Sequence, residues 1–142
     1  MAIVFRAAII ALSAICLGCA SGSSSVPVSG VVTLDGKPLS NALVAFQPIS
    51  ESGGTPGVGS YGVTDATGAY SLRRSDNDQP GAVVGSHRVV IDLKTESADD
   101  RDPKSRPPAK TLPARYNRQS ELQFKVESGG SKAANFELKS QP

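Results

Sequence analysis

Short runs of alternating apolar and polar residues, each followed by a turn signal, constrain this fold more than any other feature of the chain. Seven such runs follow residue 27, and no stretch beyond residue 26 keeps apolar residues at helical spacing over three turns. Alternation with a period of two is typical of strands that bury one face. The pattern therefore predicts an all-β domain.

Each predicted strand ends close to Gly, Pro or Asp, and Gly supplies the positive φ that tight turns need. The strands are expected over residues 28–34, 42–47, 59–64, 69–72, 87–93, 122–127 and 135–139, with turns at 35–36, 65–68, 80–81 and 129–130. Seven strands with one apolar face each predict two antiparallel sheets over one core, as a sandwich or barrel. The expected core consists of Val28, Val32, Leu34, Val44, Phe46, Tyr70, Leu72, Val89, Ile91, Leu93, Leu122, Phe124, Val126, Phe136 and Leu138.

The first 18 residues differ in composition from the rest of the chain. Arg6 precedes an almost wholly apolar run over residues 7–17, and small residues follow it. That run is too short for a membrane span, which needs about 20 residues. A basic start, a short apolar run and a small-residue end are typical of a secretory signal peptide. We therefore expect residues 1–18 to be removed.

Residues 16–19, Cys-Leu-Gly-Cys, resemble the bacterial lipobox, although Cys16 stands where a Leu is usual. The resemblance implies that Cys19 receives a diacylglycerol on its sulfur and becomes the acylated N-terminus. Stable anchoring takes more than one acyl chain, and this modification supplies them on one residue. Ordinary secretion with a free thiol at residue 19, or an uncleaved anchor helix, are the alternatives. Residues 19–26 would form the lipidated Cys and a flexible Ser-rich tether, with the domain over residues 27–139.

Composition excludes several functions. The chain has two cysteines, so removal of Cys16 and lipidation of Cys19 would leave no thiol for a disulfide, a nucleophile or a metal ligand. Fifteen Lys and Arg stand against 13 Asp and Glu, which predicts no nucleic-acid partner, because that needs a concentrated basic surface. The expected partners are the membrane, through the lipid anchor, and an envelope protein or glycan on the periplasmic or outer-surface side.

Five motifs, in order, resemble the carboxypeptidase regulatory-like domain, a transthyretin-like (prealbumin-like) β-sandwich. They lie at residues 28–39, 42–46, 64–70, 80–91 and 112–117. The resemblance covers residues 27–139 and implies a seven-stranded antiparallel Greek-key sandwich that performs no chemistry. It therefore implies no cofactor and no catalytic residue to carry over.

Individual polar residues point to structure rather than to catalysis. His87 is the only histidine, and a general base or a metal site normally needs convergent partners, so we interpret it as capping the end of the core. Asp65 is expected to accept backbone donors in an Asx turn. Asp76 and Asp78 are a weak basis for a cation site, and we expect them to be ordinary charged surface residues.

The segment 94–113 contains four prolines and many charges, which favours disorder or a surface crossing. Its acidic residues alternate with basic ones and lack the ligand spacing of a known calcium loop. These acidic residues are Glu96, Asp99, Asp100 and Asp102. A module that binds a small ligand or a cation such as calcium through this segment is the alternative hypothesis.

The main hypothesis is a non-enzymatic, membrane-anchored envelope lipoprotein that presents a β-sandwich for structural, protein or glycan contact. A hydrolase is a distant third. Some transthyretin-like relatives are hydrolases that need several His and Arg residues and a C-terminal Tyr-Arg-Gly-Ser. This chain has one His and ends Leu-Lys-Ser-Gln-Pro, so the resemblance to those enzymes does not extend to their activity.

Overall fold

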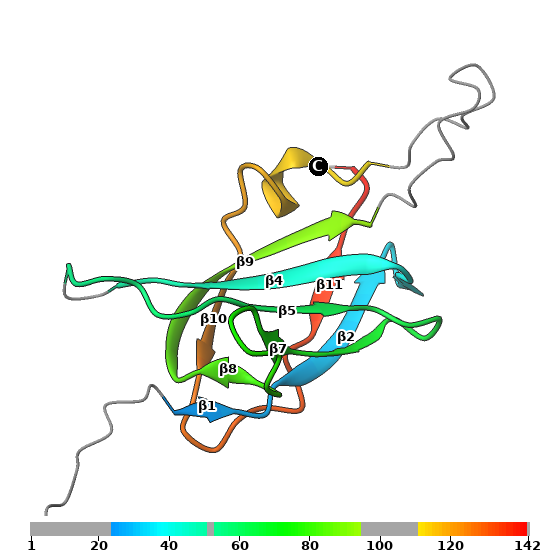
Figure 1. Cartoon of the computed structure of the whole chain (residues 1–142). Coiled ribbons are helices and arrows are strands. Elements are labelled where there is room, and N and C mark those ends of the chain that lie inside the picture. Colours follow the sequence, from blue (N-terminus) through cyan, green and yellow to red (C-terminus); the bar gives the residue numbers. More distant parts are fainter. Residues whose placement is uncertain (1–23, 51–52, 95–110, 142) are drawn as a thin grey trace, which may run out of the picture.

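The structure is a computed structural model that describes residues 24–50, 53–94 and 111–141. Within these ranges it contains eleven strands, one 3-10 helix and no α-helix, so the predicted all-β class is confirmed (Figure 1). None of the described residues form a helix with the length and apolarity to cross a bilayer. The elements are β1 (Ser25–Val26), β2 (Ser29–Leu34), β3 (Lys37–Pro38), β4 (Ala42–Pro48), β5 (Ser60–Val63), β6 (Ala69–Ser71), β7 (Arg73–Arg74), β8 (Ala82–Val83), β9 (Gly85–Leu93), η1 (Ala114–Tyr116), β10 (Gln123–Val126) and β11 (Phe136–Leu138).

The larger sheet has five antiparallel strands in the order β10-β9-β4-β5-β7 (Figure 1). Its central pair, β4 and β9, is in register from Ala42 opposite Leu93 to Pro48 opposite His87. On both strands every second side chain has no exposed surface, from Ala42 to Phe46 and from His87 to Ile91. The alternation that predicts these strands therefore also identifies the face that they bury.

The second sheet is built around β2, which pairs with β11 on one side and with β6 and β3 on the other. β11 runs parallel to β2, with Phe136 opposite Val32, whereas the sequence predicts antiparallel strands throughout. The connection from β10 explains the difference. In it, the backbone N–H of Ser131 donates to the carbonyl of Pro27 at 2.9 Å. The chain thus reaches the start of β2 before β11 begins, and both strands then run in the same direction.

One stretch of chain, residues 69–74, belongs to both sheets. In β6, Tyr70 pairs with Gly30 of β2, and in β7, Arg73 pairs with Tyr61 of β5. The two sheets are joined at this seam. β10 is an edge strand of the larger sheet, and β11 is an edge strand of the second sheet. The result is a sandwich-like body whose outward surface is continuous from β2 across β6 to β5.

The core between the sheets agrees closely with the expected set. Eleven of the fifteen expected side chains are buried, and the other four, Leu34, Leu93, Leu122 and Phe124, are half-buried and pack against them. Six further apolar residues are buried but are not in the expected set. Ala42 begins β4, and the other five lie in two-residue strands, around η1 or in a connection. These are Ala82, Val83, Leu112, Tyr116 and Ala134.

Four strands, β1, β3, β7 and β8, have two residues each and were not among the seven predicted. Two residues are too few to show an alternation, so only their pairing identifies them as strands. The turn expected at residues 35–36 explains β3. Asp35 and Gly36 have φ angles of 51° and 78°, and they place Lys37 directly opposite Leu34.

Candidate functional site

His87 is fully buried near the start of β9, as its position on the inward face predicts. Its Nδ1 lies 3.0 Å from the carbonyl oxygen of Gly85, and because a carbonyl only accepts, Nδ1 carries the proton of the neutral ring. Nε2 is buried and has no hydrogen-bond partner within the described ranges. The ring of Phe46 lies 5.7 Å away. Burial lowers the pKa of His87, so the fold stabilises the uncharged imidazole.

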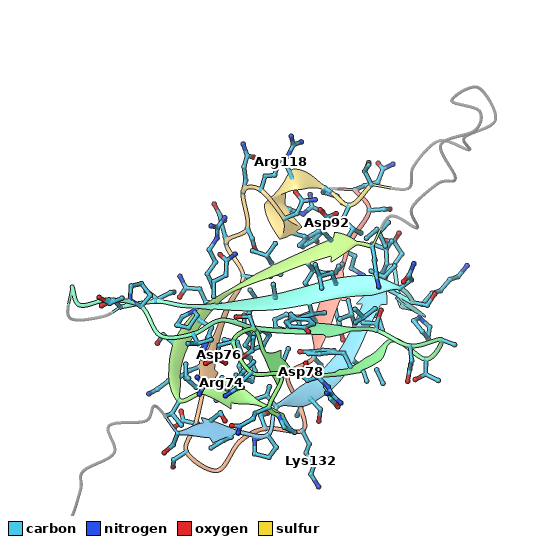
Figure 2. All side chains as sticks on the ribbon, in the orientation of Figure 1. Arg74, Asp76, Asp78, Asp92, Arg118 and Lys132 are labelled. Carbon is cyan, nitrogen blue, oxygen red and sulfur yellow. The ribbon has the colours of Figure 1, made fainter. Side chains whose placement is uncertain are left out.

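The acidic residues of the β7–β8 connection are paired with arginines. Arg74 and Asp76 form an ion pair at 2.6 Å, and Arg73 and Asp78 form one at 2.7 Å. Figure 2 shows Arg74, Asp76 and Asp78 on this part of the domain, away from Lys132 at its lower edge. The hydrogen bond from Arg74 lowers the pKa of Asp76. Across the residues that the structure describes, no group of three His, Cys, Asp or Glu side chains is placed to hold a metal ion.

Asp65 forms the Asx turn that the sequence predicts. Its Oδ1 accepts hydrogen bonds from the Thr67 backbone at 2.8 Å, the Thr67 hydroxyl at 2.7 Å and the Ala69 backbone at 3.1 Å. The bond from the Thr67 hydroxyl is the main reason that the pKa of Asp65 is lowered. Gly68, with a φ of 76°, completes the turn into β6. The carboxylate is therefore committed to holding β5 and β6 together.

Three predictions fall on residues outside the described ranges and stay predictions. They concern the signal peptide over residues 1–18, the lipidated Cys19, and the acidic cluster of the 94–113 segment. The members of that cluster are Glu96, Asp99, Asp100 and Asp102.

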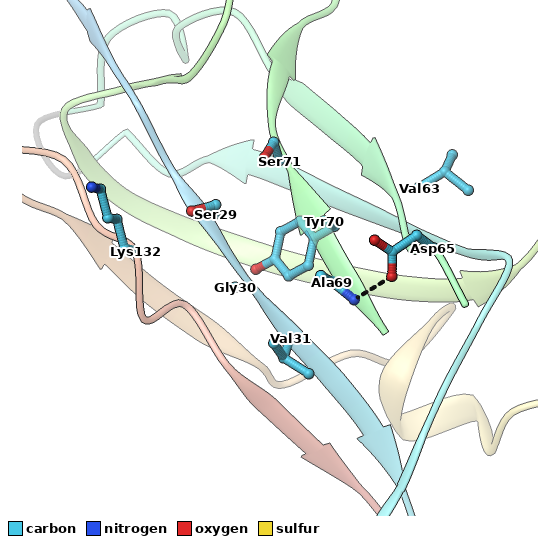
Figure 3. A pocket seen from close by; sticks show the side chains of 9 residues that line it. All are labelled: Ser29, Gly30, Val31, Val63, Asp65, Ala69, Tyr70, Ser71 and Lys132. Carbon is cyan, nitrogen blue, oxygen red and sulfur yellow. Dashed lines mark hydrogen bonds between the residues drawn. The ribbon is translucent and has the colours of Figure 1, made fainter. Parts of the chain in front are cut away.

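An open hollow of about 530 Å³ lies over the outward face of β6, and we call it the β6 trough (Figure 3). Small side chains, Ala69 and Ser71, form its floor. Val31 of β2 and Val63 of β5 stand on either side of β6, and both line the hollow (Figure 3). The face is concave here because small residues on the middle strand lie between larger ones. The lining residues are Ser29, Gly30, Val31, Val63, Asp65, Ala69, Tyr70, Ser71 and Lys132.

Exposed apolar side chains continue from this trough onto the larger sheet. Leu43 of β4 lies directly opposite Val63, and Tyr61 lies two residues before Val63 on β5. Together with Val31, these residues form what we call the outer band, and each is 37–40% exposed. Single exposed apolar residues are ordinary on a protein surface, but adjacent ones on a sheet face are typical of an interaction surface.

The β6 trough offers contact rather than reactive groups. The hydroxyl of Tyr70 donates to the carbonyl oxygen of Ala134 at 2.6 Å, and the Tyr70 side chain is buried. The Asp65 carboxylate is held in its turn, and Lys132 lies at the other end of the trough (Figure 3). A lysine ammonium, small hydroxyls and flanking valines suit the recognition of another surface.

Comparison with known proteins yields no match: no family model, no curated protein and no solved structure resembles this chain closely enough to be identified. The resemblances seen in the sequence, to the lipobox at residues 16–19 and to the regulatory-like domain at residues 27–139, therefore remain predictions. The observations that bear on function are the geometry of the β6 trough and of the outer band.

The outer band was not predicted from the sequence, although a signal for it is present. Val31, Leu43 and Val63 stand at positions where a half-buried strand usually carries polar side chains. Apolar residues at both parities of a strand indicate either a second buried layer or an exposed apolar face. Only the arrangement of the sheets distinguishes the two cases, and among the described residues these side chains remain exposed.

Proposed function

We propose that this chain is a non-enzymatic envelope lipoprotein, anchored through Cys19, whose β-sandwich contacts a protein partner through the outer band. The observation that carries the proposal is that Val63, Leu43 and Tyr61 are neighbours on β5 and β4, and that Val31 lines the same trough as Val63. Each of the four is more than a third exposed. Covering exposed apolar side chains with a partner removes them from water, which favours the complex.

A protein partner is favoured over a glycan by the chemistry of the band. Three of its four side chains are aliphatic, and the one aromatic residue, Tyr61, has its hydroxyl 3.3 Å from Oδ1 of Asp78. Sites for small polar ligands combine aromatic faces with several convergent polar groups. The band instead resembles the apolar centre of a protein interface, with Lys132 at the edge of the adjoining trough.

The lipoprotein part of the proposal is supported by the lipobox-like residues 16–19 and by where the domain begins. β1 starts at Ser25, six residues after Cys19, and the intervening sequence is rich in Ser and Gly. A short polar linker of this kind connects an anchor to a folded domain. We also propose that the architecture is a Greek-key, prealbumin-like sandwich of seven principal strands. Such a sandwich would contain the features seen here, namely two joined sheets, an Asx turn and hairpin turns.

Intact mass spectrometry of the protein extracted from membranes tests the anchor. We expect a mass that corresponds to a chain beginning at Cys19 and carrying acyl groups, and we expect Cys19→Ala to abolish both processing and membrane association. A wild-type chain recovered as a water-soluble species that begins elsewhere would refute the anchor.

Photo-crosslinking in intact cells tests the contact surface. A photoreactive amino acid at position 63 should form a discrete protein adduct, and Leu43→Asn should reduce its yield. The matched control places the same amino acid at position 125 on β10, because the Lys125 side chain is 70% exposed and lies outside the outer band. Equal adducts from both positions, or an adduct from position 63 that is unaffected by Leu43→Asn, would contradict the proposal.

A further inference from the structure

A second group of exposed apolar side chains lies at a different end of the domain. Ile49, just after β4, is 40% exposed, and Val84, between β8 and β9, is 46% exposed. The two are held close together because the backbone N–H of Ile49 donates to the carbonyl of Ser86 at 2.8 Å. A β-carbon on Gly57 would also lie 3.4 Å from Cγ2 of Val83, so the β4–β5 connection packs against β8.

A hollow of about 300 Å³ lies between these segments, and residues 48–50, 55–57 and 83–87 line it. None of these lining residues is Asp, Glu, Lys or Arg; the acidic Glu51 lies outside the described residues. We call the surface formed by Ile49, Val84 and this hollow the tether end. It combines exposed aliphatic side chains with prolines and hydroxyls and with no charged lining group, which suits an interfacial environment.

The chain enters the domain at this surface. β1 pairs with β8, and Ser25 lies opposite Val83, the residue before Val84. Figure 1 shows β1, β8 and the β4–β5 connection on the same side of the molecule. Cys19 is six residues before Ser25, so even a fully extended linker places the two within about 22 Å of each other. Leu43 and Val63 of the outer band lie farther away, since Asp92, opposite Leu43, is about 24 Å along β9 from Gly85.

We infer that the tether end is a lipid-contacting surface, with Ile49 and Val84 at the boundary between headgroups and acyl chains of the membrane that holds the anchor. The inference rests on the proposed lipidation of Cys19, which keeps this end of the domain at a high effective concentration near the bilayer. Contact there removes both aliphatic side chains from water. It leaves Leu43 and Val63 of the outer band, near the far end of β9, away from the membrane and accessible to a protein partner.

Site-specific fluorescence on the full acylated protein tests the inference. The mature lipidated chain has no free thiol, so Val84→Cys and Ile49→Cys each introduce a single position for an environment-sensitive dye. The labelled proteins are reconstituted in phosphatidylethanolamine–phosphatidylglycerol vesicles, with and without brominated acyl chains. Val63→Cys, at 39% exposure, and Leu43→Cys, at 37%, are the matched controls on the outer band.

We expect dyes at positions 84 and 49 to shift to shorter emission wavelengths on reconstitution and to be quenched by the brominated lipid. Dyes at positions 63 and 43 should show neither change. Val84→Asp should also reduce the quenching measured at position 49. An acylated protein whose four labelled positions respond equally, or not at all, would overturn the inference and leave the anchor intact. A protein that mass spectrometry shows to be unacylated would overturn the anchor and the inference together.

Discussion

The carbonyl oxygen of Ala134 occupies the place where a β-carbon on Gly30 would lie. This close approach brings the connection before β11 against the start of β2. The same carbonyl accepts the hydroxyl of Tyr70 at 2.6 Å, and Tyr70 lies opposite Gly30 in the β2–β6 pair. One glycine, one tyrosine and one backbone carbonyl thus connect three segments that are far apart in sequence.

Gly30→Ala should destabilise the domain because the added methyl group meets backbone, which cannot rotate away. Overpacking of this kind typically lowers the free energy of unfolding by about 1–3 kcal/mol. Urea unfolding followed by circular dichroism measures the change. The control is Gly129→Ala, since a β-carbon there meets nothing within 4 Å. If the two variants had equal midpoints, the close approach would be refuted.

Tyr70→Phe should leave the buried Ala134 carbonyl without its hydroxyl donor. An unsatisfied buried acceptor typically lowers the free energy of unfolding by about 1–3 kcal/mol. Tyr61→Phe is the matched control, because the Tyr61 hydroxyl is at the surface and its bond to Asp78 is 3.3 Å long. A Tyr70→Phe variant no less stable than Tyr61→Phe would contradict the role of this hydrogen bond.

The burial of neutral His87 predicts a loss of stability in mild acid. Its pKa is lower in the folded chain than in the unfolded one, so stability is complete above the unfolded value of 6.5. As the pH falls below that value, the unfolded chain binds a proton that the folded chain does not. Stability then declines by up to about 1.4 kcal/mol per pH unit until the folded pKa is reached.

Unfolding in urea at about pH 7.5 and about pH 5.5 measures this His87 contribution, since the carboxylates titrate mainly below that window. His87→Gln removes the titrating group. The difference in free energy of unfolding between the two pH values should therefore be smaller for the variant than for the wild type, whatever the absolute stability of the variant. The charged forms of neighbours do not complicate the comparison, because the register partners of His87 are Pro48 and Phe124. An unchanged pH dependence would show that another group is responsible.

The Asx turn at Asp65 predicts a pH dependence in stronger acid. The pKa of this carboxyl is lowered by its hydrogen bonds, the largest effect coming from the Thr67 hydroxyl. Its contribution to stability is therefore present above the ordinary value of 3.8 and is lost as the pH falls through the folded value. Asp65→Ala should be less stable than the wild type at neutral pH, and thermal unfolding should show that the difference narrows in acid. Thr67→Val should weaken the same dependence, and a difference that grew in acid would contradict this assignment.

Most of the strands and most of the core could be predicted from sequence because each depends on local pattern. The run from His87 to Leu93 alternates strictly, and its buried side chains follow that alternation. The turn at Asp65 was predictable as well, since its hydrogen bonds span four residues. The buried Leu112 and Tyr116 were not, because they flank a 3-10 helix that has no period of two. The sequence also predicts no metal site, no catalytic residue and no cofactor, and these remain predictions.

The sequence by itself determined where the chain alternates, where it turns, and that its first 19 residues resemble an export and lipidation signal. These properties depend on neighbouring residues and on side-chain chemistry, which a sequence displays directly. Tertiary structure alone decided that β11 runs parallel to β2 and that residues 69–74 join both sheets. It also decided that Val63 lies opposite Leu43 and lines one trough with Val31. Each of these arrangements arises from pairing between segments distant in the chain, where backbone hydrogen bonding and close packing select one partner among many that the local pattern allows.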